Sequence, residues 1–370
     1  MAKSKTEKNL CRTIDKWDDY YNEELLEPIF GYIRENKDKY FVAFREGIIT
    51  IYYKKRVLIS LKPESKDKWT IYRREFFKTK SKNPQIVKEF ENLKNEFEDN
   101  LKSIGFGKGK QWTMNLEKAK NRDYENLIEA TKKYIDKRFE GKDIEETIQG
   151  QIMCDYQDIN KDLLCIDTEY TQSFENDKAR KNSDIKGRYD FIFLKKNSSS
   201  DTYKLVFVEL KSRKSACTSH TSGVINHWSD MNIYLQNYEN NKDGIQENMK
   251  AGILFAVETK KKLNLIKSDI KIDFNDPEFW ILFKMSEKEK DNDNEPYSIA
   301  KVEALIDAEI NSAKKTKSDT EIQKMKNNPV KINEKDIPKY DLLNYREYVD
   351  QIKQSIVEKS YYAYFDKIKD

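Results

Sequence analysis

The pattern of hydrophobic and polar positions in the first part of the chain predicts one helix and a small antiparallel sheet. Residues 17–36 read as a helix, and the segments that follow are short and rich in β-branched and aromatic residues. The break from Arg45 to Gly47 is short enough for a hairpin turn, and Pro63 to Asp67 is predicted as a longer loop. The strands of this meander are predicted at 40–45, 48–54, 56–61 and 69–77, before a charged segment at 78–122.

A second set of elements is predicted between residues 123 and 283. Apolar residues on one face predict helices over 123–139 and 143–154, and a further helical stretch is expected at about 224–240. The predicted strands are 163–170, 188–194, 203–211, 252–258 and 279–283. The chain after residue 285 is charged and reads as mostly helical, with helices at 302–315 and 341–369.

This order of elements predicts an α/β (α+β) protein with three domains. The first domain, 1–115, is built on the meander and its helix, with a role in recognition, regulation or assembly. The second domain, 116–285, holds the remaining strands. The third, 286–370, is expected to be a helical extension that packs on the second.

Composition excludes several classes of protein. Hydrophobic residues make up 37% of the chain and charged residues 36%, but 22 Tyr and 18 Phe provide enough apolar surface for folded domains. The four Cys and two His include no C-x-x-C pair, so neither a zinc finger nor a disulfide framework is predicted. The first residues lack the apolar region of a secretory signal, and no stretch approaches the ~18 apolar residues of a membrane span. We therefore expect a cytoplasmic protein that does not enter a membrane.

The strands predicted at 188–194 and 203–211 are joined by a polar run, so they should pair as an antiparallel hairpin. Counting outwards from the middle of that run places Asp190 directly across from Glu209, with their Cβ atoms ~5 Å apart. Lys211 lies two residues beyond Glu209, so strand periodicity places it on the same face, roughly 6 to 7 Å further along. The pattern predicts three charged groups that converge at one end of the hairpin.

Both strands are otherwise apolar on both faces, which predicts a central position in a sheet that is covered by helices. Two carboxylates that face each other at the end of a buried strand repel and are poorly solvated, so a divalent cation between them is the simplest remedy. Mg²⁺ suits such a site because it accepts one or two protein carboxylates and keeps several waters. A nearby Lys ammonium can orient an attacking water or offset charge on a phosphate, which is the chemistry of phosphodiester hydrolysis.

Asp190, an 18-residue gap and the triplet Glu209-Leu210-Lys211 at the end of an apolar strand resemble the signature of the PD-(D/E)XK superfamily of restriction-endonuclease-like nucleases. The predicted element order α, β, β, β, α, β over about 143–260 is similar to that family's core, although a tyrosine replaces the nominal proline before the Asp. The resemblance implies a central mixed β-sheet flanked by helices. It also implies that Asp190, Glu209 and the Leu210 carbonyl bind Mg²⁺, with Mn²⁺ as a substitute, and that Lys211 positions the attacking water.

The resemblance further implies a helix glutamate before the first strand, followed three or four residues later by an apolar residue and Gln. The segment Glu145-Glu146-Thr147-Ile148-Gln149 has this pattern, with Glu145 as the match and Glu146 as the alternative. Ordinary solvated helix carboxylates are an equally good interpretation of both. Glu169, on the first strand, is another candidate for the site, and it could equally be a surface charge at a strand end.

A second Glu-x-Lys triplet, Glu258-Thr259-Lys260, lies at the end of the strand predicted at 252–258. No Asp precedes it on an adjacent paired strand, because a helix and a polar loop intervene. This favours Glu209 and Lys211 as the functional pair. The competing interpretation of that pair is an exposed ion pair at a strand tip.

Basic residues are concentrated around the hairpin. Eleven basic and four acidic residues lie between residues 178 and 214, a surplus larger than the +4 of the whole chain. Such a collar suits a polyphosphate substrate, although a solvated Lys-rich surface gives the same count. Nucleic-acid contacts are assigned to Lys186, Arg188, Arg213, Lys214 and His227. For His227, a packed or hydrogen-bonded helix position is the competing interpretation.

These features predict a Mg²⁺-dependent endonuclease, with DNA favoured over RNA by family precedent and prokaryotic restriction or anti-phage defence as its setting. Two alternatives remain. One is a catalytically silent nuclease-fold protein that binds nucleic acid or acts as a scaffold, and the other is a ligand-gated nuclease effector that acts on RNA. A homodimer, and an activating partner or ligand bound through the N-terminal domain, are both compatible with the sequence.

Overall fold

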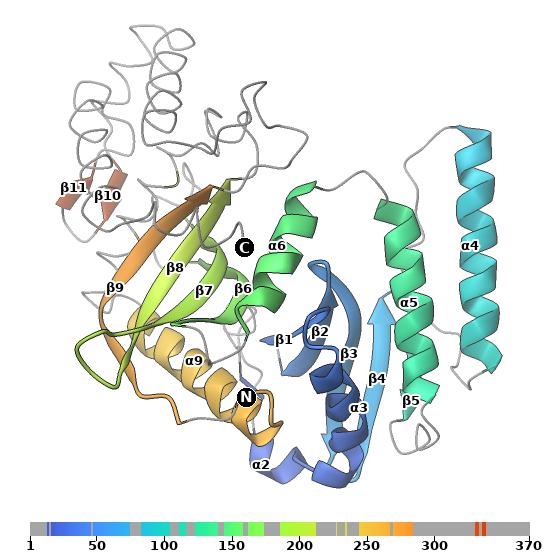
Figure 1. The fold of residues 1–370 in the computed structure, drawn as a ribbon, viewed down its shortest axis with the longest axis horizontal. Coiled ribbons are helices and arrows are strands. Elements are labelled where there is room, and N and C mark those ends of the chain that lie inside the picture. The colour runs from blue at the N-terminus through green and yellow to red at the C-terminus, as the bar shows by residue number, and fades with distance from the viewer. Residues whose placement is uncertain are drawn as a thin grey trace, which may run out of the picture. The chain divides into compact units, whose positions relative to one another are not determined.

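The computed structural model describes residues 13–14, 16–45, 47–74, 83–103, 111–115, 123–139, 144–157, 162–173, 186–211, 227, 234, 244–266, 269–283, 330–332 and 335–337. The chain divides into two compact units, each made of two segments (Figure 1). The first unit combines Met1–Ile166 with Ala251–Ile270, and the second combines Asp167–Lys250 with Lys271–Asp370. The predicted three-domain division at 115 and 285 stays a prediction. No helix in the described ranges is long and apolar enough to cross a membrane.

The first unit is built on a five-stranded antiparallel sheet with the strands in chain order. The strands are β1 (Tyr40–Arg45), β2 (Ile48–Tyr53), β3 (Arg56–Ser65), β4 (Lys68–Arg74) and β5 (Gln111–Asn115). The predicted meander and its first hairpin turn are confirmed. The longer loop predicted at 63–67 is wrong, because β3 continues through a bulge after Pro63 and leaves a two-residue turn before β4. The charged segment also holds two elements that the hydrophobic pattern missed, namely α4 (Pro84–Ser103) and β5.

The helix predicted over 17–36 consists of two helices, α2 (Trp17–Tyr20) and α3 (Glu23–Glu35). The break occurs because Asn22 has an extended backbone, and its side-chain oxygen accepts a hydrogen bond from the N–H of Leu25 at 3.3 Å. An Asn in this position is an ordinary N-cap, which starts a new helix.

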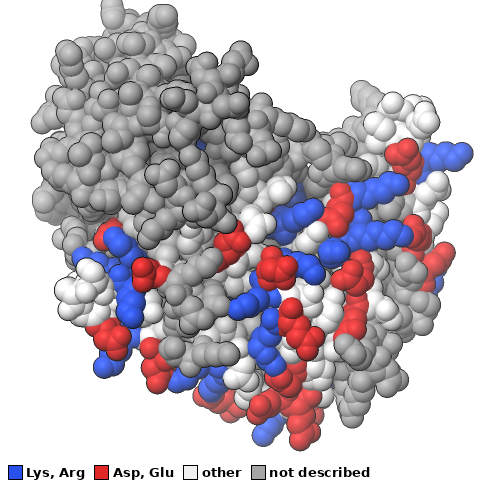
Figure 2. Space-filling model, in the orientation of Figure 1, with Lys and Arg blue, Asp and Glu red and all other residues white. Residues whose placement is uncertain are grey.

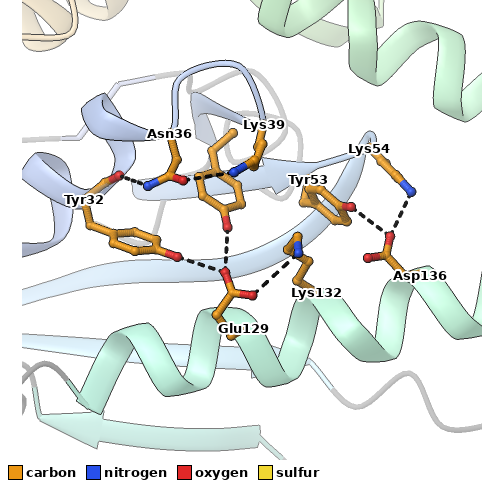
Figure 3. A network of polar contacts seen from close by, with 9 residues as sticks. Tyr32, Asn36, Lys39, Tyr53, Lys54, Glu129, Lys132 and Asp136 are labelled. Atoms are coloured by element: carbon orange, nitrogen blue, oxygen red, sulfur yellow. Dashed lines mark hydrogen bonds and ion pairs between the residues drawn. The ribbon is translucent and has the colours of Figure 1, made fainter.

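Helices α5 (Asp123–Phe139) and α6 (Ile144–Asp155) confirm the two helices predicted in this region. Two acidic residues of α5 hold it to the sheet (Figure 3). Glu129 accepts hydrogen bonds from the hydroxyls of Tyr32 on α3 and Tyr40 on β1, at 2.9 and 3.3 Å. Asp136 accepts one from Tyr53 on β2 at 2.8 Å. Burial, together with these carboxylates, raises the pKa of both Tyr40 and Tyr53, so the hydroxyls stay protonated donors.

The turn between β2 and β3 is strained and lies against α6. Lys54 and Lys55 have φ angles of 47° and 62°, the left-handed region that a type I′ turn requires and that Asn and Gly usually fill. Gly150 of α6 lies directly on this turn, because a Cβ there would meet the Lys54 Cα at 2.5 Å and the Lys55 nitrogen at 2.9 Å. Helix and turn therefore pack backbone against backbone, and only glycine fits at the contact.

The later segment of the first unit, residues 251–270, contacts its N-terminal helices. The Phe255 ring lies edge-on to Trp17, with centroids 6.0 Å apart, and also to Phe44 at 5.4 Å. Arg34 donates a hydrogen bond to the Leu263 carbonyl at 3.0 Å. Residues far apart in the sequence thus complete one core.

The second unit carries a four-stranded sheet in the order β6-β7-β8-β9 (Figure 1). Its strands are β6 (Leu163–Ser173), β7 (Lys186–Lys196), β8 (Tyr203–Lys211) and β9 (Ile272–Phe283). The boundary between the two units falls within β6 and within the helix α9 (Ile245–Lys262). β7 pairs antiparallel and β9 parallel to β8, so the sheet is mixed. The protein is therefore a mixed α+β structure, as the sequence predicted at this coarse level.

The strand predicted at 252–258 is wrong, because these residues lie inside α9. Buried Met249, Ile253, Ala256 and Val257 recur at helical spacing, whereas the run GILFAVE alone does not distinguish a strand from a buried helix. In the C-terminal region the described residues form a short hairpin of β10 (Val330–Ile332) and β11 (Lys335–Ile337). The helices predicted at 302–315 and 341–369 lie outside the described residues, as does the stretch at 224–240 apart from His227 and Tyr234, which have helical backbone.

Candidate active site

The β7–β8 hairpin has the predicted register. Its pairs run from Lys196↔Tyr203 at the turn to Phe191↔Val208. Pairing in the described hairpin ends there, so the next pair, Asp190 across from Glu209, is not part of the ladder. β8 continues to Lys211 alongside β9, which supports the end of β8 from its other edge.

Asp190 takes part in the sheet through its side chain. Its Oδ2 accepts a hydrogen bond from the Leu210 N–H at 2.7 Å, where a regular ladder would supply a backbone carbonyl. The hydroxyl of Thr168 on β6 donates to the Asp190 carbonyl at 2.9 Å. The Tyr189 ring lies 4.8 Å from that of Phe207, on the face of β8 that also carries Glu209, so the alternation of β7 breaks at Asp190. Backbone and carboxylate of Asp190 are thus both fixed at the strand end.

Glu209 and Lys211 form a buried ion pair on one face of β8. Their relative exposures are 6% and 3%, and the Lys211 Nζ lies 3.0 Å from the Glu209 Oε1. This confirms the prediction that they share a face and excludes an exposed pair at a strand tip. The His227 Nδ1 lies 2.7 Å from the same Oε1.

The environment keeps Glu209 ionised. Burial alone would raise the pKa of its carboxyl, but the Lys211 charge and the His227 hydrogen bond outweigh burial and hold the pKa below its ordinary value. A glutamate that is nearly buried and still ionised at neutral pH can act as a cation ligand or as a hydrogen-bond acceptor.

The donor set fits a hard cation. Carboxylates of Asp190 and Glu209 and a backbone carbonyl such as that of Leu210 are oxygen donors of the kind that Mg²⁺ prefers. Among the described residues both contacts of the Glu209 side chain involve Oε1, so Oε2 is the oxygen that a metal would take. In the described part of the chain no three His, Cys, Asp or Glu side chains form a metal-binding group. A site with two carboxylates and several waters is consistent with that finding.

The remaining acidic candidates lie on α6 and β6. Glu145, half-buried in the first turn of α6, and Glu146, which forms an ion pair with Arg56 of β3, both belong to the first unit. Glu169 lies on β6 in the second unit with a φ of 50°, a left-handed conformation that is unusual for Glu inside a strand and is found at β-bulges.

The second Glu-x-Lys triplet is not at a strand end, because Glu258 and Lys260 lie on α9. Glu258 is exposed, whereas Lys260 is buried with its Nζ 4.1 Å from the centroid of the Phe41 ring. Residues two apart on a helix point in different directions, so this pair makes no shared site.

The predicted nucleic-acid contacts are only partly described. The backbones of Lys186 and Arg188 belong to β7, but their side chains lie outside the described residues, as do Arg213 and Lys214. Figure 2 shows acidic and basic side chains interspersed on one face of the described residues. His227 is described, and its Nδ1 contacts Glu209.

The structure therefore brings together Asp190, Glu209, Lys211 and His227 at one end of β7 and β8. Sequence reasoning missed the Thr168 hydroxyl and the His227 contact. Thr168 lies in the polar second half of β6, where nothing distinguishes it from its neighbours. A hydrogen-bonded helix position was an interpretation of His227, but nothing in the sequence indicated Glu209 as its partner. Comparisons with protein-family models, with curated proteins and with solved structures found no match to this chain.

Proposed function

We propose that this protein is a Mg²⁺-dependent nuclease that hydrolyses phosphodiester bonds at the end of the β7–β8 hairpin. The observation that carries the proposal is the buried, ionised pair of Glu209 and Lys211 beside a fixed Asp190. A buried ion pair adds little net stability, because the desolvation of both charges offsets much of their attraction. A functional role accounts for the cost.

The charges of the site favour a divalent cation and then an anion. The formal charges of Asp190, Glu209 and Lys211 sum to −1, and Glu209 and Lys211 are buried. A divalent cation reverses the sign, and the resulting positive charge attracts a phosphate group. The proposed order of binding, metal first and phosphodiester second, follows from this balance.

Each residue has a separate role in the proposed reaction. Asp190, oriented by the Leu210 N–H, and the Oε2 of Glu209 would hold the metal, assisted by the Leu210 carbonyl. The bound metal supplies Lewis-acid polarisation of the phosphate and a water of lowered pKa. Lys211 is held by Glu209 in a site with little access to solvent, and its ammonium would orient the attacking water and stabilise charge that develops on phosphate oxygens.

The order of elements supports the same proposal. With 252–258 corrected to helix, the described elements run α6, β6, β7, β8, α9, β9, the order that the PD-(D/E)XK resemblance implies. By that resemblance the substrate is DNA rather than RNA, Mn²⁺ substitutes for Mg²⁺, and restriction or anti-phage defence in a prokaryotic cytoplasm is the setting. A homodimer and an activator that binds the first unit are compatible with this function.

The test is a cleavage assay on the full-length protein. Plasmid, linear duplex DNA, single-stranded DNA and RNA are incubated with Mg²⁺, with Mn²⁺ and with chelator, using wild type and Asp190→Ala, Glu209→Gln and Lys211→Ala. The matched control is Glu258→Gln, which removes a glutamate charge from an exposed helix position of the other Glu-x-Lys triplet. We expect metal-dependent cleavage that the three site variants reduce by about a hundredfold or more and the control leaves unchanged. Equal cleavage by wild type and all three site variants would overturn the assignment of Asp190, Glu209 and Lys211 as the active site.

The catalytically silent alternative predicts a different result. A binding or scaffold protein would bind nucleic acid as wild type and in all four variants, and neither the wild type nor any variant would cleave it. A filter-binding measurement in chelator therefore accompanies the assay, because it separates loss of binding from loss of chemistry.

A further inference from the structure

One oxygen of Glu209 accepts from two different parts of the chain. The Lys211 Nζ lies 3.0 Å and the His227 Nδ1 2.7 Å from Oε1. The last torsion of a Glu side chain is broad and roughly two-fold, so a single donor leaves the plane of the carboxylate loosely defined. Two donors on the same oxygen fix that plane and determine which oxygen is left for a ligand.

A second residue that follows β8 in the chain, Tyr234, packs on the same strand face as His227. His227 and Tyr234 both have helical backbone. The Tyr234 side chain is fully buried, and its ring centroid is 5.2 Å from those of both Tyr189 and Phe207. Phe207 shares a face of β8 with Glu209. His227 and Tyr234 therefore contact the same face of β8, the face that carries Glu209.

We propose that His227 is a positioning residue for Glu209, acting through its Nδ1–H, and that it does not serve as a nucleic-acid contact. This inference rests on the proposed function, since it concerns the same site. Its role is to fix the Glu209 carboxylate so that Oε2 faces the metal. The role does not depend on the charge of the imidazole, because Nδ1 carries a proton in the imidazolium and in one neutral tautomer.

Three substitutions separate donation at Nδ1 from other roles. His227→Asn keeps an N–H donor at the δ position, and His227→Gln moves the donor to the ε position. His227→Ala removes the donor altogether. A residue that positions Glu209 through Nδ1 should tolerate Asn better than Gln, whereas a phosphate contact through Nε2 should tolerate Gln better than Asn.

Two measurements report on the role. The first is the Mg²⁺ concentration for half-maximal cleavage, taken together with kcat and with KM for nucleic acid. The second is Mn²⁺ binding without nucleic acid, followed by electron paramagnetic resonance, which requires no turnover. We expect His227→Ala to raise the half-maximal Mg²⁺ concentration and to lower the affinity for Mn²⁺, each by about 10 to 100-fold. This is the usual cost of losing an outer partner of a metal ligand. KM for nucleic acid should not change, and Glu258→Gln should match wild type.

Each outcome has a distinct meaning. Weakened metal binding in His227→Ala and His227→Gln, with rescue in His227→Asn, supports the inference. Metal affinity unchanged in all three variants, or a raised KM that Gln rescues and Asn does not, would overturn the inference while the nuclease function stands. A wild type that neither cleaves nor binds Mn²⁺ would overturn the proposed function. Circular dichroism of each variant identifies a loss of folding. If His227→Ala or His227→Gln does not fold, the Mn²⁺ affinity of His227→Asn compared with that of wild type decides whether the inference holds.

Discussion

The contact between Gly150 and the Lys54–Lys55 turn gives a sharp stability prediction. In Gly150→Ala the added Cβ would meet the Lys54 Cα at 2.5 Å, its carbonyl carbon at 2.8 Å and the Lys55 nitrogen at 2.9 Å. All three are backbone atoms, so no side-chain rotation relieves the clash. The matched control is Gly31→Ala on α3, where the nearest atoms are side-chain tips at 3.6 and 3.8 Å.

The two substitutions should differ in their effect on the free energy of unfolding. Overpacking of this kind costs about 3 kcal/mol or more, the upper end of the usual range, because the clash cannot be avoided without moving β2 and β3 or α6. Replacing a helical glycine by alanine raises the free energy of unfolding by about 1 kcal/mol, so Gly150→Ala should lower it by about 2 kcal/mol overall. Gly31→Ala gains the same helix term with no clash and should be neutral or more stable by up to about 1 kcal/mol.

Differential scanning calorimetry with parallel urea unfolding measures the difference. Intrinsic fluorescence reports on the first unit through the buried Trp17 and Trp69. For a unit of this size the loss in Gly150→Ala corresponds to a Tm lower by about 4 to 8 °C, against an unchanged or higher Tm in Gly31→Ala. If Gly150→Ala is as stable as Gly31→Ala, the close packing of α6 on the turn is refuted.

Three further predictions concern buried groups. Thr131 on α5 is fully buried and its hydroxyl has no partner among the described residues, so Thr131→Val should raise the free energy of unfolding by about 1 to 2 kcal/mol in urea titrations; a decrease would show that the hydroxyl is satisfied. The pKa of Glu209 is lower in the folded than in the unfolded protein, so its stabilising effect is present above its ordinary pKa and is lost as pH falls through the folded value. Wild type should therefore lose stability in acid more steeply than Glu209→Gln, and parallel stability–pH curves would contradict the ion pair. Burial, with a nearby aspartate, raises the pKa of the Cys154 thiol to about 12, so mass spectrometry should find it unmodified by iodoacetamide at neutral pH while the protein is folded; alkylation faster than in free cysteine would be inconsistent with this environment.

The sequence predicted the hairpin register because two local signals agreed. A polar turn and long apolar strands left one alignment, and the observed pairs from Phe191↔Val208 to Lys196↔Tyr203 confirm it. The shared face of Glu209 and Lys211 followed from strand alternation alone. The departure at Asp190 was not predictable, because it depends on the Thr168 hydroxyl from β6 and on a side chain that replaces a backbone acceptor.

Other errors arose where tertiary packing decides local structure. The apolar run at 252–258 is compatible with strand and helix, and its burial inside α9 becomes apparent only from the three-dimensional structure. β5 has only five residues, so its alternation of polar and apolar side chains is too short to identify it, and its assignment depends on pairing with β4. The turn at Lys54–Lys55 carries no Gly or Asn, so its left-handed conformation had no signal in the sequence.

The two-segment construction of the first unit determines when it can fold during synthesis. Asp18 and Lys262 form an ion pair across 244 positions, and Phe255 completes the apolar surroundings of Trp17 and Phe44. At a translation rate of about 5 to 20 residues per second, roughly 12 to 50 s pass between the synthesis of the N-terminal helices and the synthesis of these partners. During that interval the aromatic faces of Trp17 and Phe44 lack their Phe255 contact, so chaperone binding to nascent chains should be greatest before residue 255 emerges. A circular permutant that joins 251–270 directly to the N-terminal segment would shorten this interval.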